Sequence, residues 1–187
     1  MTKPPVRITC ALDEETAKLL DTMRYELKTS RSDLIRRAIL FLNESKEFIE
    51  SNMRHKLEIA LNMLFSEEHV ILDVDHWLLF LKLIDSSPDK DTFWKKHEEI
   101  AKSHAEQFLN KMYSVEYIFK RLEACNFLKM VKLSDTEFTL ILRSEVSKEF
   151  IKRFVQCLLN YMGYTIEVKE DLAKLRVNII KHYAKKP

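Results

Sequence analysis

The N-terminal segment opens with a strict alternation of side chains. Over residues 6–12, one side of an extended chain carries apolar groups and the other carries polar or small groups: Ile8, Cys10 and Leu12 against Arg7, Thr9 and Ala11. This period of two predicts a short β-strand. A lone strand leaves both of its edges unpaired, so we expect it to pair with the same strand of a second chain. The pattern therefore predicts a homodimer.

Two amphipathic helices are predicted after this strand. Asp13 is a good N-cap, and apolar residues at helical spacing predict a helix over 14–27. Ser30 and Asp33 have the spacing of a capping box, with Asp in place of the usual Glu, and begin a second helix. One strand and two helices bury too little surface to form a core alone, so this unit, residues 1–44, needs its second copy.

Helical spacing continues through the middle of the chain. An apolar stripe to about Phe65 predicts a connecting helix within 45–66, before a second domain over 67–187. The stripe consists of Ile49, Met53, Leu57, Ala60, Leu61 and Leu64. Three further helices are predicted at 73–84, 91–112 and 114–127. The first of them is apolar on all sides, and we therefore expect it to be buried on several sides.

The C-terminal part then changes to β-type alternation. A hairpin is predicted around Ser134–Asp135 and a second one near Asp171. Between them, an amphipathic helix runs over 147–162 and ends at Gly163 in the C′ position. The expected fold class is mainly α with an α+β C-terminal part, in which a helical region precedes a ββαββ unit.

Composition excludes several classes of protein. Gly163 is the only glycine among 187 residues. Phosphate-binding loops, dinucleotide-binding fingerprints and nucleophile elbows each need several glycines, so none of them is present. A turn-rich β-sandwich or barrel is equally excluded. With 31 basic and 29 acidic residues the net charge is +2, and any nucleic-acid contact must come from a local basic surface.

The cysteines indicate a reducing compartment. Cys10, Cys125 and Cys157 are odd in number, widely spaced and form no CxxC pair. We expect reduced, mostly buried thiols in a cytoplasmic protein. The longest strongly apolar stretch, residues 70–84, is interrupted by charged side chains, so no membrane span is predicted.

The N-terminal unit resembles a known family. The run from Arg7 to Leu12 (Arg-Ile-Thr-Cys-Ala-Leu) and the run from Ser30 to Ile39 (Ser-Arg-Ser-Asp-Leu-Ile-Arg-Arg-Ala-Ile) are similar to ribbon-helix-helix regulators of the Arc, MetJ and CopG type. The resemblance covers about residues 5–44 and departs from the family pattern at Lys28, which replaces a turn glycine. It implies a dimer whose paired strands enter the major groove of DNA.

The resemblance implies DNA contacts for three residues of the strand. Arg7 binds a guanine edge or a phosphate, and Thr9 binds a base or touches a thymine methyl group. Ala11 offers only apolar contact, so we expect modest base specificity from each dimer.

Three further DNA contacts are implied at the start of the second helix. The backbone amides of Ser30, Arg31 and Ser32, together with the helix dipole, favour a phosphate group. The plainer interpretation makes Ser30 a helix cap only and Arg31 a solvated surface residue.

The C-terminal domain offers candidates without a decisive pattern. His97 and His104 lie on an apolar helical stripe and are effector-binding, pH-sensitive or metal-ligand candidates, or partly buried histidines held by hydrogen bonds. Seven residues place them roughly 10 Å apart along the helix, too far to share one metal unaided. Asp73, Asp75 and His76 fit either metal ligands or the first turn of a helix.

No catalytic constellation is found. Cys125 and Cys157 fit either a thiol sensor or core residues, and no nucleophile–base pair or paired acids can be assembled. We therefore predict no enzyme activity, no catalytic residues, no metal site and no cofactor, and leave a small-molecule effector open.

These observations predict a cytoplasmic, sequence-specific DNA-binding transcriptional regulator, most simply a repressor. It would bind double-stranded DNA as a homodimer or higher oligomer, without membrane contact, and residues 67–187 would sense an effector or build the oligomer. Two alternatives stay open: an antitoxin-type protein that binds a partner protein, and a scaffold whose N-terminal unit dimerises without binding DNA.

Overall fold

The computed structural model describes residues 6–50, 53–67 and 69–183 of the chain. The chain divides into two compact units, Met1–Arg54 and His55–Pro187. The N-terminal unit contains α1 (Glu14–Glu26) and α2 (Arg31–Glu50), and α3 (Met53–Phe65) begins at the boundary. Both clusters of buried apolar residues belong to the C-terminal unit.

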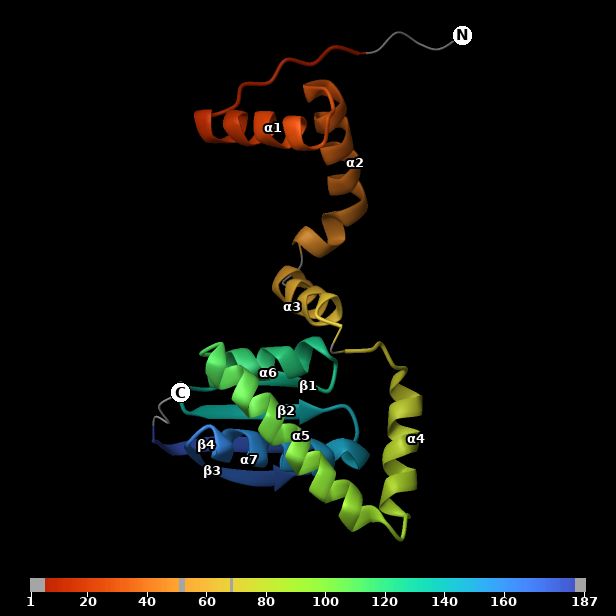
Figure 1. Cartoon of the computed structure of the whole chain (residues 1–187), viewed down its shortest axis with the longest axis vertical. Coiled ribbons are helices and arrows are strands. Elements are labelled where there is room, and N and C mark those ends of the chain that lie inside the picture. The colour runs from red at the N-terminus through yellow and green to blue at the C-terminus, as the bar shows by residue number, and fades with distance from the viewer. Residues whose placement is uncertain (1–5, 51–52, 68, 184–187) are drawn as a thin grey trace. The chain divides into compact units, whose positions relative to one another are not determined.

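The two helices of the N-terminal unit begin at the predicted caps (Figure 1). Asp13 accepts a hydrogen bond from the backbone amide of Thr16 at 2.7 Å. Ser30 Oγ accepts one from the amide of Asp33 at 3.1 Å, which is the first half of the predicted capping box. The Asp33 carboxylate accepts a hydrogen bond from the hydroxyl of Thr29 at 2.7 Å, so this aspartate stabilises the turn before the helix.

Residues 6–12 run extended but form no β-bridge within the described part of the chain. A β-ladder needs a neighbouring strand, and the unit supplies none to itself. Ile8 is 84% exposed, and Cys10, which we expected to be buried, is exposed as well. Leu34 is the only buried residue that the structure describes in this unit. A single copy therefore has no hydrophobic core.

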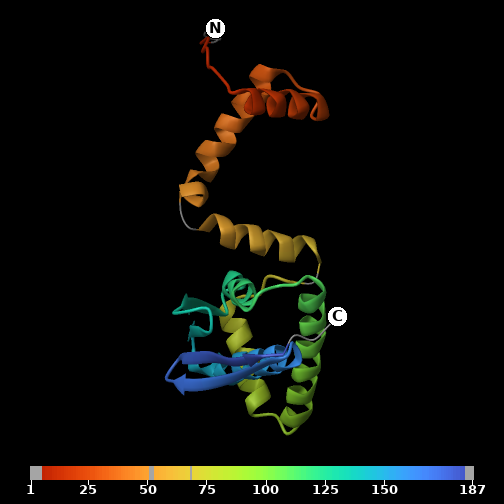
Figure 2. The ribbon, with the colours of Figure 1, turned by 90° about the vertical axis from the view of Figure 1, so that its left-hand side faces the viewer.

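The C-terminal unit contains the remaining helices and a four-stranded antiparallel sheet (Figures 1 and 2). The helices are α4 (Val74–Asp85), α5 (Lys90–Asn110), α6 (Val115–Ala124) and α7 (Lys148–Tyr161), with a short 3-10 turn at Glu145–Ser147. The strands are β1 (Leu128–Lys132), β2 (Glu137–Leu142), β3 (Tyr164–Asp171) and β4 (Lys174–His182), in the order β1-β2-β4-β3. The predicted fold class and its ββαββ unit are confirmed.

One face of this sheet carries the main core. Alternate residues of β2 and β4, such as Leu140 and Leu175, are fully buried beneath α6 and α7. Phe119 of α6 meets Phe138 of β2 edge to face, with ring centroids 5.1 Å apart. Helix α5 packs against α7 and so forms an outer layer (Figure 2).

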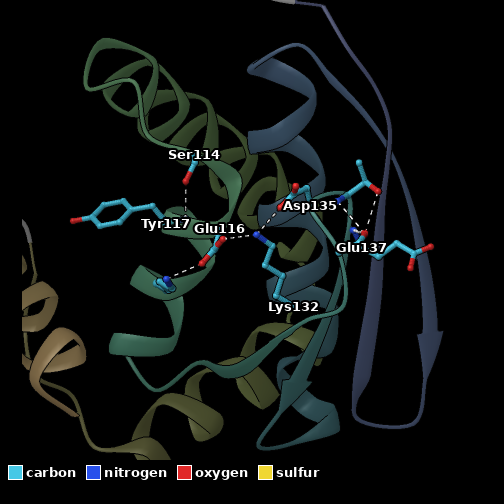
Figure 3. Close-up of polar contacts among 9 residues, drawn as sticks. Ser114, Glu116, Tyr117, Lys132, Asp135 and Glu137 are labelled. Atoms are coloured by element: carbon cyan, nitrogen blue, oxygen red, sulfur yellow. Dashed lines mark hydrogen bonds and ion pairs between the residues drawn. The ribbon is translucent and has the colours of Figure 1, made fainter. Parts of the chain in front are cut away.

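An ion-pair network fastens α6 to the sheet (Figure 3). Glu116 contacts Lys120 at 2.7 Å and Lys132 of β1 at 2.8 Å, and Lys132 also contacts Asp135 at 2.7 Å. Hydrogen bonds from the two lysines lower the pKa of Glu116 to about 2, and those to Asp135 and Glu116 raise the pKa of Lys132 to about 12. The network joins α6 to β1 on the side of the helix that faces away from the core.

Several of the described helices end in a residue with left-handed backbone, and two of these residues test predictions made from the sequence. Gly163 follows α7 with φ 91°, which confirms the predicted C′ glycine. Lys28 follows α1 with φ 50°, so this lysine adopts the conformation that the resemblance assigned to glycine. The amide of Thr29 donates to the carbonyl of Arg24 at 3.1 Å and closes the end of α1.

The prediction that residues 73–84 are buried on several sides is wrong. In α4 only Leu81 is buried, whereas Leu79, Phe80 and Leu83 are about half exposed. The helix packs along one side only. When apolar residues occur all round a helix, the sequence pattern does not show which of them will be buried. Within the described ranges, none of the helices combines the length and the apolarity that a membrane crossing requires.

The stripe of the predicted connecting helix is also displaced. In α3 the buried residues are Ile59 and Met63, whereas Leu57 and Leu61 are exposed. Ile59 and Met63 are buried because they pack against Ala124 at the end of α6.

The backbone conformation of Leu172, in the turn between β3 and β4, predicts that a substitution there stabilises the protein. Asp171 and Lys174 pair across it, and Leu172, 76% exposed, adopts φ 48° at the first loop position, where hairpins favour glycine. Leu172→Gly should raise the free energy of unfolding by about 0.5–1 kcal/mol, because the left-handed cost for a non-glycine residue exceeds the entropy cost of glycine. Trp77 and Trp94 both lie in this unit, so urea unfolding followed by tryptophan fluorescence measures it.

The neighbouring loop residue supplies the control. Ala173 is not among the described residues with positive φ, so Ala173→Gly should lower the free energy of unfolding by about 0.5–1 kcal/mol. Equal effects of the two substitutions would contradict the strain assigned to Leu172.

Candidate nucleic-acid interface

The three candidate base-contacting residues lie on the extended segment before α1. Arg7, Thr9 and Ala11 are all exposed. In a β-strand, the alternation of side chains would place these three residues on one side, with Ile8 and Leu12 on the opposite side. A strand formed by this segment would therefore have a polar face and an apolar face.

The start of α2 presents the second candidate feature. Ser30, Arg31 and Ser32 are exposed, and the geometry of a helix start leaves the first-turn amides of Arg31 and Ser32 without intrahelical acceptors. Ser30 serves as a cap through its side chain, as the plainer interpretation held. A cap and an anion-binding helix start are compatible, because they use different groups.

Arg31 is engaged by an aspartate that the sequence analysis did not single out. Its guanidinium binds Asp21 of α1 through two contacts, Nε to Oδ1 at 2.8 Å and Nη2 to Oδ2 at 2.5 Å. These bonds hold the pKa of Asp21 below its ordinary value and raise that of Arg31. A phosphate that reaches Arg31 would therefore either compete with Asp21 for the guanidinium or share the guanidinium with it.

The ion pairs around the start of α2 leave an excess of positive charge. Four guanidinium groups contact two carboxylates: Arg24 and Arg31 on Asp21, and Arg36 and Arg37 on Asp33. Four positive and two negative charges give this cluster a net +2, although residues 1–44 as a whole carry only +1. This local excess, together with the helix dipole, favours an anion.

The two candidate histidines of α5 line one cavity in the C-terminal unit, of about 450 Å³. His97 is buried, and its Nε2 lies 3.0 Å from the carbonyl oxygen of Phe150, so Nε2 carries the proton and donates it. Burial lowers the pKa of His97 below its ordinary value of 6.5, which leaves the ring neutral at pH 7. His104 lies against the rings of Phe108 and Phe154.

The remaining candidates have structural partners. Asp73 caps α4 by accepting the amides of Asp75 and His76 at 2.9 and 3.3 Å, as the first-turn interpretation requires. The thiol of Cys125 contacts Met63 and that of Cys157 contacts the carbonyl of Glu98, and burial raises the pKa of both. The structure therefore brings the two thiols to different partners. Among the described residues, no group of three potential metal ligands gathers.

Comparison with known proteins identifies the class of the N-terminal module. Residues 6–44 match the family model described as ribbon-helix-helix protein, copG family, which confirms the resemblance seen in the sequence. Proteins with this module typically dimerise and bind DNA, as regulators or antitoxin-type proteins. The comparisons with curated proteins and with solved structures gave no match.

The bond between Arg31 and Asp21 predicts how the titration of Asp21 changes when Arg31 is replaced. Because Arg31 holds the pKa of Asp21 below its ordinary value of 3.8, Arg31→Gln should raise that pKa toward 3.8. Carboxyl-carbon NMR of the full chain between pH 2 and pH 6 measures it. The contribution of this pair to stability is present above the unfolded pKa and is lost as the pH falls through the folded one.

Arg36→Gln is the matched control. Arg36 contacts Asp33 and not Asp21, so this variant should leave the titration of Asp21 unchanged. An Asp21 midpoint that is the same in the original chain and in Arg31→Gln would refute the assigned contact.

Proposed function

We propose that this chain is a cytoplasmic, DNA-binding transcriptional repressor that acts as a homodimer. Residues 1–44 would form the DNA-binding module, residues 45–66 a connecting region that contains the end of α2 and the whole of α3, and residues 67–187 a regulatory domain. The observation that carries the proposal is the two-faced segment 6–12, apolar on one side and bearing Arg7, Thr9 and Ala11 on the other, within the region that matches the ribbon-helix-helix family.

Dimerisation follows from what a single copy leaves exposed. The apolar side of segment 6–12 and the apolar residues of α1 lie open to solvent, and α1 has no buried residue. Pairing two copies of the segment as antiparallel strands satisfies their backbone groups and covers Ile8, Cys10 and Leu12. Exposed apolar area of this kind favours association.

The paired strands would then present Arg7, Thr9 and Ala11 twice on one face. A two-stranded ribbon fits the major groove, where Arg7 and Thr9 read base edges. The start of α2, with its amides and the net +2 cluster, would hold the phosphate backbone and fix the ribbon in register. Arg31 would exchange part of its bond to Asp21 for the phosphate.

The C-terminal unit favours regulation over an antitoxin role. An antitoxin segment that wraps a partner is typically short and folds on binding. Here residues 55–187 have their own core, with Leu140, Leu159 and Leu175 fully buried. A folded domain with a cavity suits the sensing of an effector.

Two adjacent substitutions separate dimerisation from DNA binding. Ile8→Asp places a charge on the apolar side of both strands, so it should weaken the dimer by about 100-fold or more and abolish DNA binding with it. Thr9→Asp places the same charge on the polar side, so it should leave the dimer intact and repel DNA. Sedimentation equilibrium of the full chain measures the first effect. A dimer that survives Ile8→Asp would refute the ribbon as its interface.

Base reading is tested with an Arg7→Ala/Thr9→Ala variant. Fluorescence anisotropy against the chain's own upstream DNA and a scrambled duplex, at two salt concentrations, should show about 10- to 100-fold weaker binding to the upstream duplex. The scrambled duplex should lose less, because its binding depends on phosphate contacts.

Lys169→Ala, which removes an exposed charge from β3, is the control and should leave both affinities unchanged. Equal affinity for both duplexes in all variants would show that the chain binds DNA only through non-specific electrostatic attraction. Absence of any binding would favour the scaffold alternative.

A further inference from the structure

The cavity lined by His97 and His104 has the size and the walls of a small-molecule site. Its volume of about 450 Å³ lies within the usual range of ligand pockets. It is enclosed by α5, α6 and α7 together with Met63 of α3 and His69. Rings form much of its wall, from Phe93, Phe108, Phe127, Phe150 and Phe154. Such walls favour a flat aromatic ligand through edge and face contacts.

The charges around this cavity are of one sign. Lys96 and Arg121 line it, and among its described lining residues there is no Asp or Glu. Lys96 contacts Glu99 at 2.7 Å, so its charge is already balanced. No carboxylate of the described residues forms an ion pair with Arg121, whose guanidinium lies over the ring of Phe108 at 5.4 Å. A cation at an apolar wall without a counter-ion favours an anionic ligand.

A second polar group at the same wall lacks a partner. The Nδ1 atom of His69 is buried and has no hydrogen-bond partner among the described residues. Buried polar atoms are ordinarily paired, and an unpaired one calls for an explanation. This atom has almost no accessible surface, so a bound molecule would become its partner only after the ring turns toward the cavity.

We propose that this cavity binds a small aromatic carboxylate, with Arg121 pairing the carboxylate and the phenylalanine walls holding the ring. This inference deepens the regulatory role proposed above: the site would be the effector site. The binding itself depends only on the C-terminal unit, whereas the effect on DNA rests on the proposed function.

The cavity also adjoins the helix that continues from the DNA-binding module. Met63 of α3 forms part of its wall and contacts the thiol of Cys125 at 3.7 Å. About two helical turns before Met63, Lys56 of α3 contacts Asn126 at 2.7 Å. A ligand that displaces Met63 would therefore act on α3, which begins only three residues after α2 ends.

The test compares two probes that share one ring system and differ in the head group, which is a charged carboxylate in one and a neutral amide in the other. Isothermal titration calorimetry of the full chain with 1-naphthylacetate and its neutral amide, 1-naphthylacetamide, should show the carboxylate bound about 10-fold or more tightly. Arg121→Gln should abolish that preference. Arg143→Gln removes an exposed arginine outside the cavity and should keep it. No binding of either probe, or a preference that survives Arg121→Gln, would overturn the inference.

A second variant covers the case in which Arg121→Gln fails to fold. Ile100 lines the cavity and is 55% exposed, so Ile100→Trp should fill the space without disturbing the core and weaken both probes by about 10-fold. Unchanged affinity in this variant would place the probe elsewhere and overturn the assignment.

The anisotropy assay with and without 1-naphthylacetate then tests regulation. A changed DNA affinity would support the effector role. Intact probe binding with an unchanged DNA affinity would refute that role and leave the site standing.

Discussion

The N-terminal module depends on one constraint: a single extended segment cannot satisfy its own backbone. Residues 6–12 have no neighbouring strand within the described chain, and their apolar side is open to water. Pairing with a second copy resolves both conditions at once, because antiparallel strands share hydrogen bonds while one face becomes interior. The polar face is then duplicated around a two-fold axis. The same pairing that would complete the fold would therefore create the surface proposed to read DNA.

The ion pairs of the module place arginines of α1 and α2 around the same two aspartates. Asp21 and Asp33 each gather two arginines around the start of α2, and their pKa values are lowered by these contacts and by the hydroxyl of Thr29. The arginines are largely exposed and the two aspartates are partly exposed, so the pairs contribute little to stability in water. Their effect is to hold guanidinium groups beside free amides, where a phosphate would lie.

Local signals predicted the fold well, and contacts between distant residues were not predictable. Asp13, Ser30 and Gly163 act within a few residues of themselves, so their roles followed from spacing alone. The bond of Arg31 to Asp21 joins two helices, and no periodicity encodes it. The exposed side of α4 was not predictable either, because burial depends on which other element packs against the helix. Among the candidate residues, His97 and His104 were found by their apolar stripe, whereas Arg121 and His69 were missed because they gain meaning only as walls of one cavity.

Under the proposed function, an effect of the ligand would pass from the cavity to α3. Ile59 and Met63 anchor α3 against Ala124 and Cys125, and Met63 is also part of the cavity wall. A ligand can change DNA affinity only to the extent that it binds one arrangement of α3 better than another. By reciprocity, DNA must then change the affinity for the ligand by the same factor. The strength of this coupling is set by the few contacts that hold α3, so regulation would depend on the small buried cluster around Met63 more than on the main core of the sheet.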